Sequence, residues 1–117
     1  MSAVAPWHVP PLSVRCDWNG RAATVTVCGD VDFATMPILS QQLSEVTARQ
    51  PDRLVIDLSE AGFIDAACVG AIIRTRHALP GHCPLIFRSP PRHVRQVLDV
   101  CGLDLLCTIE APGEIAG

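Results

Sequence analysis

Residues 53–76 read RLVIDLSEAGFIDAACVGAIIRTR, and this stretch decides the fold. It opens with a short apolar run rich in β-branched residues, which is typical of a buried parallel strand. After a connection, Phe63 and Ile64 return the chain to the core. Asp65 then stands where its carboxylate can cap a helix over residues 66–79. The first turns of that helix carry small side chains, so its N-terminal amides and positive dipole end are open to a partner.

The remaining segments alternate between strand and helix patterns. The Asn19-Gly20 pair is a strong hairpin signal, and Thr35 is the expected cap of the first helix. The expected strands cover residues 12–17, 21–28, 53–58, 85–87 and 105–110, the expected helices lie near 36–48, 66–79 and 91–101, and residues 29–32 and 59–62 are connections. This order, β-β-α-β-α-β-α-β, predicts an α/β fold with helices packed on a mixed sheet.

Length and composition fit one domain with an aliphatic core. The chain has 117 residues, of which 49% are hydrophobic and only 4% aromatic. We expect the domain over residues 12–111, between a loose proline-containing lead-in at 1–11 and a tail at 112–117. No apolar run approaches the length of a membrane span, and the first residues do not read as a secretory signal. The sequence therefore predicts a cytoplasmic protein without membrane insertion.

The charge and the reactive residues exclude several function classes. The formal net charge of −3 argues against direct nucleic-acid binding. The six cysteines form no C-x-x-C pair, so we expect free thiols. His77, His82 and Cys83 lack a fourth zinc ligand, and the Asp30 and Asp32 pair is typical of a loop. We expect no metal, no cofactor and no enzymatic activity, because no nucleophile has a recognisable base.

Helical spacing divides residues 66–79 into two faces. At about 100° per residue, Val69, Ile72 and Ile73 define the buried stripe. The residues expected on the outer face are mostly small: Ala67, Gly70, Ala71, Arg74 and Ala78. An interior glycine costs about 1 kcal/mol relative to alanine, so Gly70 favours a surface that a partner approaches closely.

Three motifs, in order, resemble the signature of STAS domains, the fold shared by anti-sigma factor antagonists and the cytoplasmic ends of some anion transporters. Members typically read D-L-S-x-V-x-F-I-D-S-S-G-L-G, and residues 57–70 read DLSEAGFIDAACVG. Residues 29–35, GDVDFAT, are similar to G-E-L-D-x-A-T. The third motif, V-x-x-V-L-x-x-x-G-L, is matched by Val94, Val97, Leu98, Gly102 and Leu103. The resemblance covers roughly residues 12–110.

The resemblance implies an anti-sigma factor antagonist, which binds a kinase-fold anti-sigma factor and frees a sigma factor. The expected partner surface joins residues 30–35 to residues 65–74, and comprises Asp30, Asp32, Thr35, Asp65, Ala66, Ala67, Cys68, Gly70, Ala71 and Arg74. In the family a serine at the start of the second helix is the phosphorylation site. Ala66 and Ala67 occupy both serine positions here, so the usual phosphate acceptor is missing.

Cys68 stands where the family usually has glycine, and it has two interpretations. As a regulatory thiol it would ionise more readily at a helix N-terminus, although Asp65 opposes this; Cys28, Cys101 and Cys107 are candidate disulfide partners. Alternatively, Cys68 is a small packing residue at the edge of the core. A different function is also open, that of a STAS subunit of a membrane transport or lipid-trafficking ATPase complex. The sequence leaves the oligomeric state open.

Overall fold

A single five-stranded sheet organises the computed structural model, which describes residues 12–111; the expected lead-in and tail lie outside the described residues. The strands are β1 (Leu12–Asn19), β2 (Ala22–Val31), β3 (Arg53–Ile64), β4 (Leu85–Arg88) and β5 (Thr108–Glu110), in that spatial order. The helices are α1 (Met36–Ala48), α2 (Val69–Ala78) and α3 (Arg92–Val100), with short 3₁₀ turns η1 (Ala66–Cys68) and η2 (Leu103–Leu105). The predicted mixed α/β fold is confirmed.

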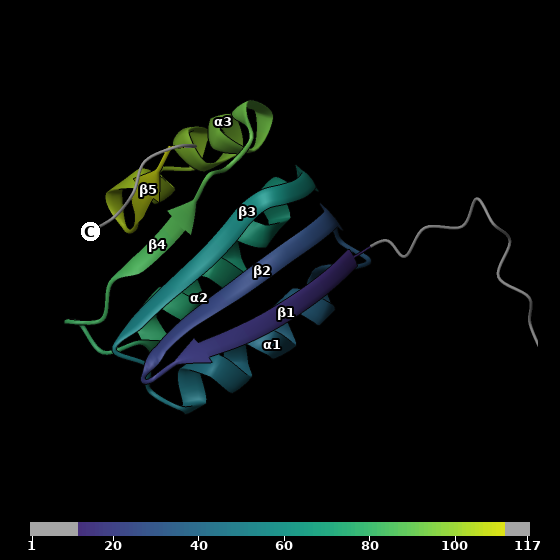
Figure 1. Cartoon of the computed structure of the whole chain (residues 1–117). Coiled ribbons are helices and arrows are strands. Elements are labelled where there is room, and N and C mark those ends of the chain that lie inside the picture. The colour runs from purple at the N-terminus through teal and green to yellow at the C-terminus, as the bar shows by residue number, and fades with distance from the viewer. Residues whose placement is uncertain (1–11, 112–117) are drawn as a thin grey trace, which may run out of the picture.

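Strand direction explains the layering seen in Figure 1. β1 pairs with β2 antiparallel, and the other neighbouring strands are parallel. The crossovers place α1 and α2 on the same face of the sheet, as parallel connections require (Figure 1). Val25, Ile56 and Phe87 lie in register across that face and are almost fully buried. α1 packs in the same core through one apolar face, with Leu39 and Leu43 buried.

The opposite face of the sheet carries polar groups. Asp57, Arg88 and Glu110 are in register across β3, β4 and β5. The Glu110 side chain is buried and lies 3.3 Å from Arg88 and 3.7 Å from Arg53. A buried carboxylate needs such partners to offset the loss of hydration. These two ion pairs therefore hold the short edge strand β5 against the centre of the sheet.

Two expected connections are strands. β2 continues to Val31 and β3 continues to Ile64, whereas the sequence analysis placed connections at residues 29–32 and 59–62. Two shifts in the β2–β3 register lie along this extension, and Gly29 adopts a φ of 110°. Such bulges let a pair of strands continue where apolar and polar residues no longer alternate. The alternation of apolar and polar residues therefore ends before β2 and β3 do.

Smaller differences concern the ends of elements. The expected helix at 66–79 begins as the 3₁₀ turn η1, and the expected strand at 105–110 is shortened by η2. The hairpin turn falls on Gly20 and Arg21, with Gly20 at a φ of 62° in the first central position, as in a type II′ turn. Gly102 closes α3 in the left-handed conformation. None of the described helices combines the length and apolar character needed to cross a bilayer.

Candidate functional site

The extended β2–β3 pairing brings the two expected surface segments together. Val31 pairs with Ile64 at the last register position, and the amide of Asp65 donates to the Val31 carbonyl at 2.9 Å. The loop after β2 and the turn after β3 therefore leave the sheet side by side. We call these neighbouring segments, residues 32–35 and 65–68, the patch. Some 30 residues separate them in the chain, and within them Thr35 and Cys68 are buried.

Asp32 holds the first of these segments in shape. Its Oδ1 accepts hydrogen bonds from the amides of Ala34 and Thr35, both at 2.9 Å. The buried Thr35 hydroxyl accepts from the Asp32 amide at 2.9 Å, and its proton is within reach of the Asp30 carbonyl. Hydrogen bonds from the backbone and the hydroxyl of Thr35 hold the pKa of the Asp32 carboxyl below its usual value.

The capping role assigned to Thr35 is therefore only half right. Thr35 occupies the N-cap position of α1 but makes no side-chain cap bond. Asp32, three residues earlier, accepts the amide protons at this helix entry instead. The cause is the backbone: Thr35 is in the helical region, whereas a capping residue usually lies in the β region.

Gly62, near the end of β3, contacts both Asp30 and α3. A Cβ at this position would lie too close to the Asp30 carboxylate, so a larger residue would require the Asp30 side chain to turn away. The Gly62 carbonyl is hydrogen-bonded to Nε2 of His93, which extends from α3. The ring N–H donates in this bond. Sequence reasoning missed both contacts, because nothing in the sequence indicates that residues 62 and 93 are neighbours.

Two aromatic side chains near the Val31–Ile64 pair in the chain are exposed. Phe33 is 74% exposed and Phe63 is 48% exposed. The expectation that Phe63 returns the chain to the core is wrong, because the irregular end of β3 turns Ile64 inward instead. Only 4% of the residues are aromatic, and aromatic residues are enriched at protein interfaces. That enrichment is the signal that could have identified Phe33.

The expected outer face of α2 is only partly exposed. Ala66, Gly70 and Arg74 are exposed, but Ala71 is 3% exposed. The expectation for Ala71 is wrong because α2 packs against α1 as well as the sheet, which widens its buried arc. Thr75 is buried on the same side and bonds to the Ala71 carbonyl. A bulky residue at position 71 would test packing and not partner contact.

Cys68 packs in the core. Its side chain is 1% exposed, and Sγ lies 3.6 Å from the Val31 carbonyl. Burial raises the pKa of the thiol to about 11, and the Asp65 and Asp32 carboxylates act in the same direction. The expected lowering of this pKa by the helix end is therefore wrong, because desolvation outweighs the dipole. These properties favour the packing interpretation of Cys68.

The other candidate thiols differ in exposure. Cys28 is exposed, and Cys101 is half-buried at the edge of a hollow beside Ala66. Burial raises the pKa of the Cys107 thiol to about 11. All of these cysteines are reduced in the structure. Among residues 12–111, no three metal-ligand side chains gather at one point.

Comparison with known proteins identifies the family. The family model described as Mlab, STAS domain, matches residues 14–108. The chain belongs to the STAS domain family. Comparison with curated protein sequences finds no match.

Several solved structures share this fold. An anti-sigma factor antagonist from Mycobacterium paratuberculosis is 24% identical, with a TM-score of 0.76, over 92% of this chain and 90% of that one. A putative anti-sigma factor antagonist from Thermotoga maritima is 14% identical, with a TM-score of 0.76, over 86% and 87%. The Bacillus cell fate determinant SpoIIAA, in its phosphorylated form, is 14% identical, with a TM-score of 0.64, over 86% and 93%. These likenesses establish the fold.

The buried thiols predict a sharp order of chemical reactivity. With iodoacetamide at about pH 8, Cys28 should be alkylated first, whereas Cys68 and Cys107 should react at least about a hundredfold more slowly, because thiolate is the reactive form. Peptide mass mapping over time measures this order. In denaturant the cysteines should react at similar rates. Alkylation of Cys68 as fast as Cys28 in the folded protein would contradict its burial.

Proposed function

We propose that this STAS protein is an anti-sigma factor antagonist that binds a kinase-fold anti-sigma factor through residues 30–35 and 65–74 and so releases a sigma factor. The observation that carries the proposal is the joining of the two segments into one patch by the Val31–Ile64 pairing. Small exposed residues such as Ala66 and Gly70 let a partner approach the backbone, and Phe33 supplies an apolar anchor. The antagonists among its structural neighbours support this role.

This function is binding and not catalysis, and its place is the cytoplasm, where sigma factors act. The candidate surface offers amides, carboxylates and small side chains. Its one thiol, Cys68, is buried with a raised pKa, so it is a poor nucleophile. The protein would act by occupying the anti-sigma factor surface that otherwise holds the sigma factor.

A displacement assay tests the function and the surface together. The protein should release sigma factor when titrated into a preformed complex of that sigma factor with the kinase-fold anti-sigma factor of the same organism. Gly70→Glu should weaken this by about tenfold or more, because it places a long acidic side chain in the contact. It should leave the fold intact, since it adds an i, i+4 pair with Arg74 and removes a helical glycine.

Gly81→Glu is the matched control, because Gly81 is exposed with open space around it, in the turn after α2. It should displace the sigma factor as the parent does. If the parent binds no anti-sigma factor but co-purifies with a membrane ATPase complex, the alternative transport or lipid-trafficking role is correct. If Gly70→Glu and Gly81→Glu behave alike in displacement, the partner surface lies elsewhere.

We also propose that the surface is not switched by serine phosphorylation. The structural neighbour SpoIIAA is known in phosphorylated and unphosphorylated forms. Here Ala66 and Ala67 have no hydroxyl to accept a phosphate. The nearest hydroxyl in the motif, Ser59, lies on β3 and donates to Asp57 at 2.7 Å. A carboxylate at that distance disfavours a phosphate group.

Incubation with the partner and ATP, followed by mass mapping, should therefore leave peptide 54–74 unmodified. Replacing the alanines singly, as Ala66→Ser and Ala67→Ser, should create an acceptor in at least one variant, with a mass gain of one phosphate. The two variants are positive controls for kinase activity. Phosphate on Ser59 of the parent chain would contradict the proposal.

Thiol regulation through Cys68 would need η1 to open, because the thiol is enclosed between the turn and Val31. Cys28 is the accessible thiol near this end of the sheet, where it pairs in register with Glu60. Redox control of partner binding would therefore depend on Cys28 more than on Cys68. In a reducing compartment both remain thiols.

A further inference from the structure

The outer edge of β1 is unpaired. β1 forms one edge of the sheet and pairs only with β2, and no other strand among residues 12–111 lies beside it (Figure 1). It is eight residues long and contains neither proline nor lysine. A long edge strand leaves a row of unpaired amides and carbonyls, which is a template for pairing with another chain. The two charged side chains of β1, Arg15 and Asp17, have opposite signs. The edge strand at the other side, β5, has only three residues.

The hairpin fixes which backbone groups of β1 point outward. Asn19 pairs with Ala22 across the two-residue turn, and such a closing pair is hydrogen-bonded. Hydrogen-bonded and non-hydrogen-bonded pairs alternate along an antiparallel ladder. The amides and carbonyls of Val14, Cys16 and Trp18 therefore point away from β2, toward the free edge.

The charges on this edge are complementary to themselves. Arg15 and Asp17 are exposed and lie two residues apart on the polar face of the sheet, with Nε and Oδ2 3.2 Å apart. If a second copy pairs antiparallel with Cys16 opposite Cys16, the Arg15 of each copy lies opposite the Asp17 of the other. In this register the outward-pointing amides and carbonyls of the two β1 strands face each other and can form hydrogen bonds.

Neighbouring registers are unfavourable. A slip of two residues, the smallest that keeps the hydrogen-bonding groups matched, places either Arg15 opposite Arg15 or Asp17 opposite Asp17. Like charges directly opposite each other destabilise a strand pair. The charge pattern therefore selects one register with twofold symmetry.

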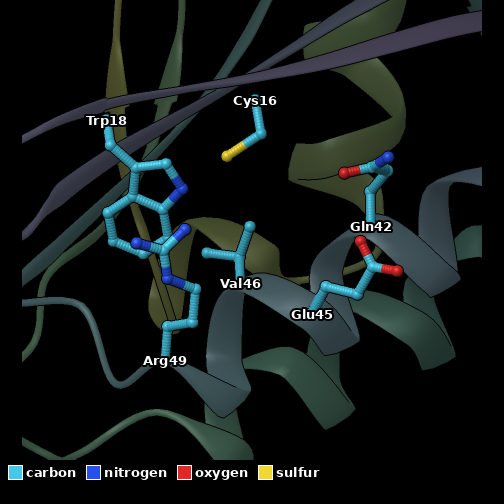
Figure 2. Close-up of a pocket in the computed structure, with 6 residues that line it drawn as sticks. All are labelled: Cys16, Trp18, Gln42, Glu45, Val46 and Arg49. Carbon is cyan, nitrogen blue, oxygen red and sulfur yellow. The ribbon is translucent and has the colours of Figure 1, made fainter.

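In this arrangement the α1 helices of the two copies lie side by side beneath the joined β1 strands. α1 packs against β1 and β2 alike. Neighbouring strands lie about 4.8 Å apart. If the axis of α1 runs beneath the middle of the β1–β2 pair, it lies about 10 Å from the axis of α1 in the second copy. This is close to the usual spacing of packed helices. A hollow between α1 and β1 opens beside this edge, lined by Cys16, Trp18, Gln42, Glu45, Val46 and Arg49 (Figure 2).

We propose that β1 is a homodimer interface, in which two copies form a continuous ten-stranded sheet centred on Cys16. The Arg49 guanidinium stacks on Trp18, 4.0 Å from the ring centre, and gives each half of the interface an ordered aromatic residue (Figure 2). The α1 helix of the second copy covers the hollow beside Cys16.

Charge reversal tests this geometry. Sedimentation equilibrium should show a dimer for the parent chain. Arg15→Asp and Asp17→Arg should each raise the dissociation constant by about tenfold or more, because each replaces two attractive cross-strand pairs with repulsive ones. An equimolar mixture of the two variants should dimerise about as well as the parent, since a mixed dimer has two complementary pairs. Because mixing cannot restore the Arg15–Asp17 ion pair within one chain, recovery of the dimer would report on contacts between chains.

Asp99→Arg is the matched control, because Asp99 forms an exposed ion pair with Arg95 on α3, away from β1. It should not change the dissociation constant, and circular dichroism should show that all variants are folded. A parent chain that stays monomeric at the concentrations used for NMR would overturn the proposal. So would a dimer that both single variants leave intact, or variants whose mixture stays monomeric.

Discussion

The pairing of β2 with β3 as far as Val31 and Ile64 positions the candidate surface. This pairing crosses two irregularities in register before it ends. The amide of Asp65 then bonds to Val31, and the Cys68 thiol closes against the same carbonyl. If the strands separated earlier, the loop at 32–35 and the turn at 65–68 would diverge. A bulged pair of parallel strands thus performs the positioning that a rigid loop alone could not.

Two groups of the surface built on this pairing keep one protonation state near neutral pH. Asp32 is ionised, and its pKa is held low by Thr35. Cys68 is protonated and enclosed. Ala66 offers no acceptor for phosphate. Under the proposed function, a phosphate, which adds about −1.5 to −2 charges, would find no serine at the start of the second helix. The surface is then suited to constitutive binding, with control falling on the amount of protein or on its assembly state.

The sequence predicted the fold well and the exposure of single residues less well. Apolar spacing predicted the strands and the three helices, because each of these elements has its own local periodicity. The order of the three motifs agreed with this prediction. The strand extensions could not be predicted, since bulges break alternation at Gly29. Ala71 and Phe63 were placed on the wrong side because their burial depends on α1 and on the end of β3. Gly62 contacts Asp30 and His93, which are far from it in the chain. Residue spacing within a single element could not predict these contacts.

Amide hydrogen exchange tests the account most directly. Exchange would be followed for the protein alone and in complex with the kinase-fold anti-sigma factor of the same organism. The account predicts that binding slows exchange at residues 31–35 and 65–70 together, because the Val31–Ile64 pairing joins them in one patch. Protection confined to the polar face of the sheet or to α3, with both segments unchanged, would contradict it.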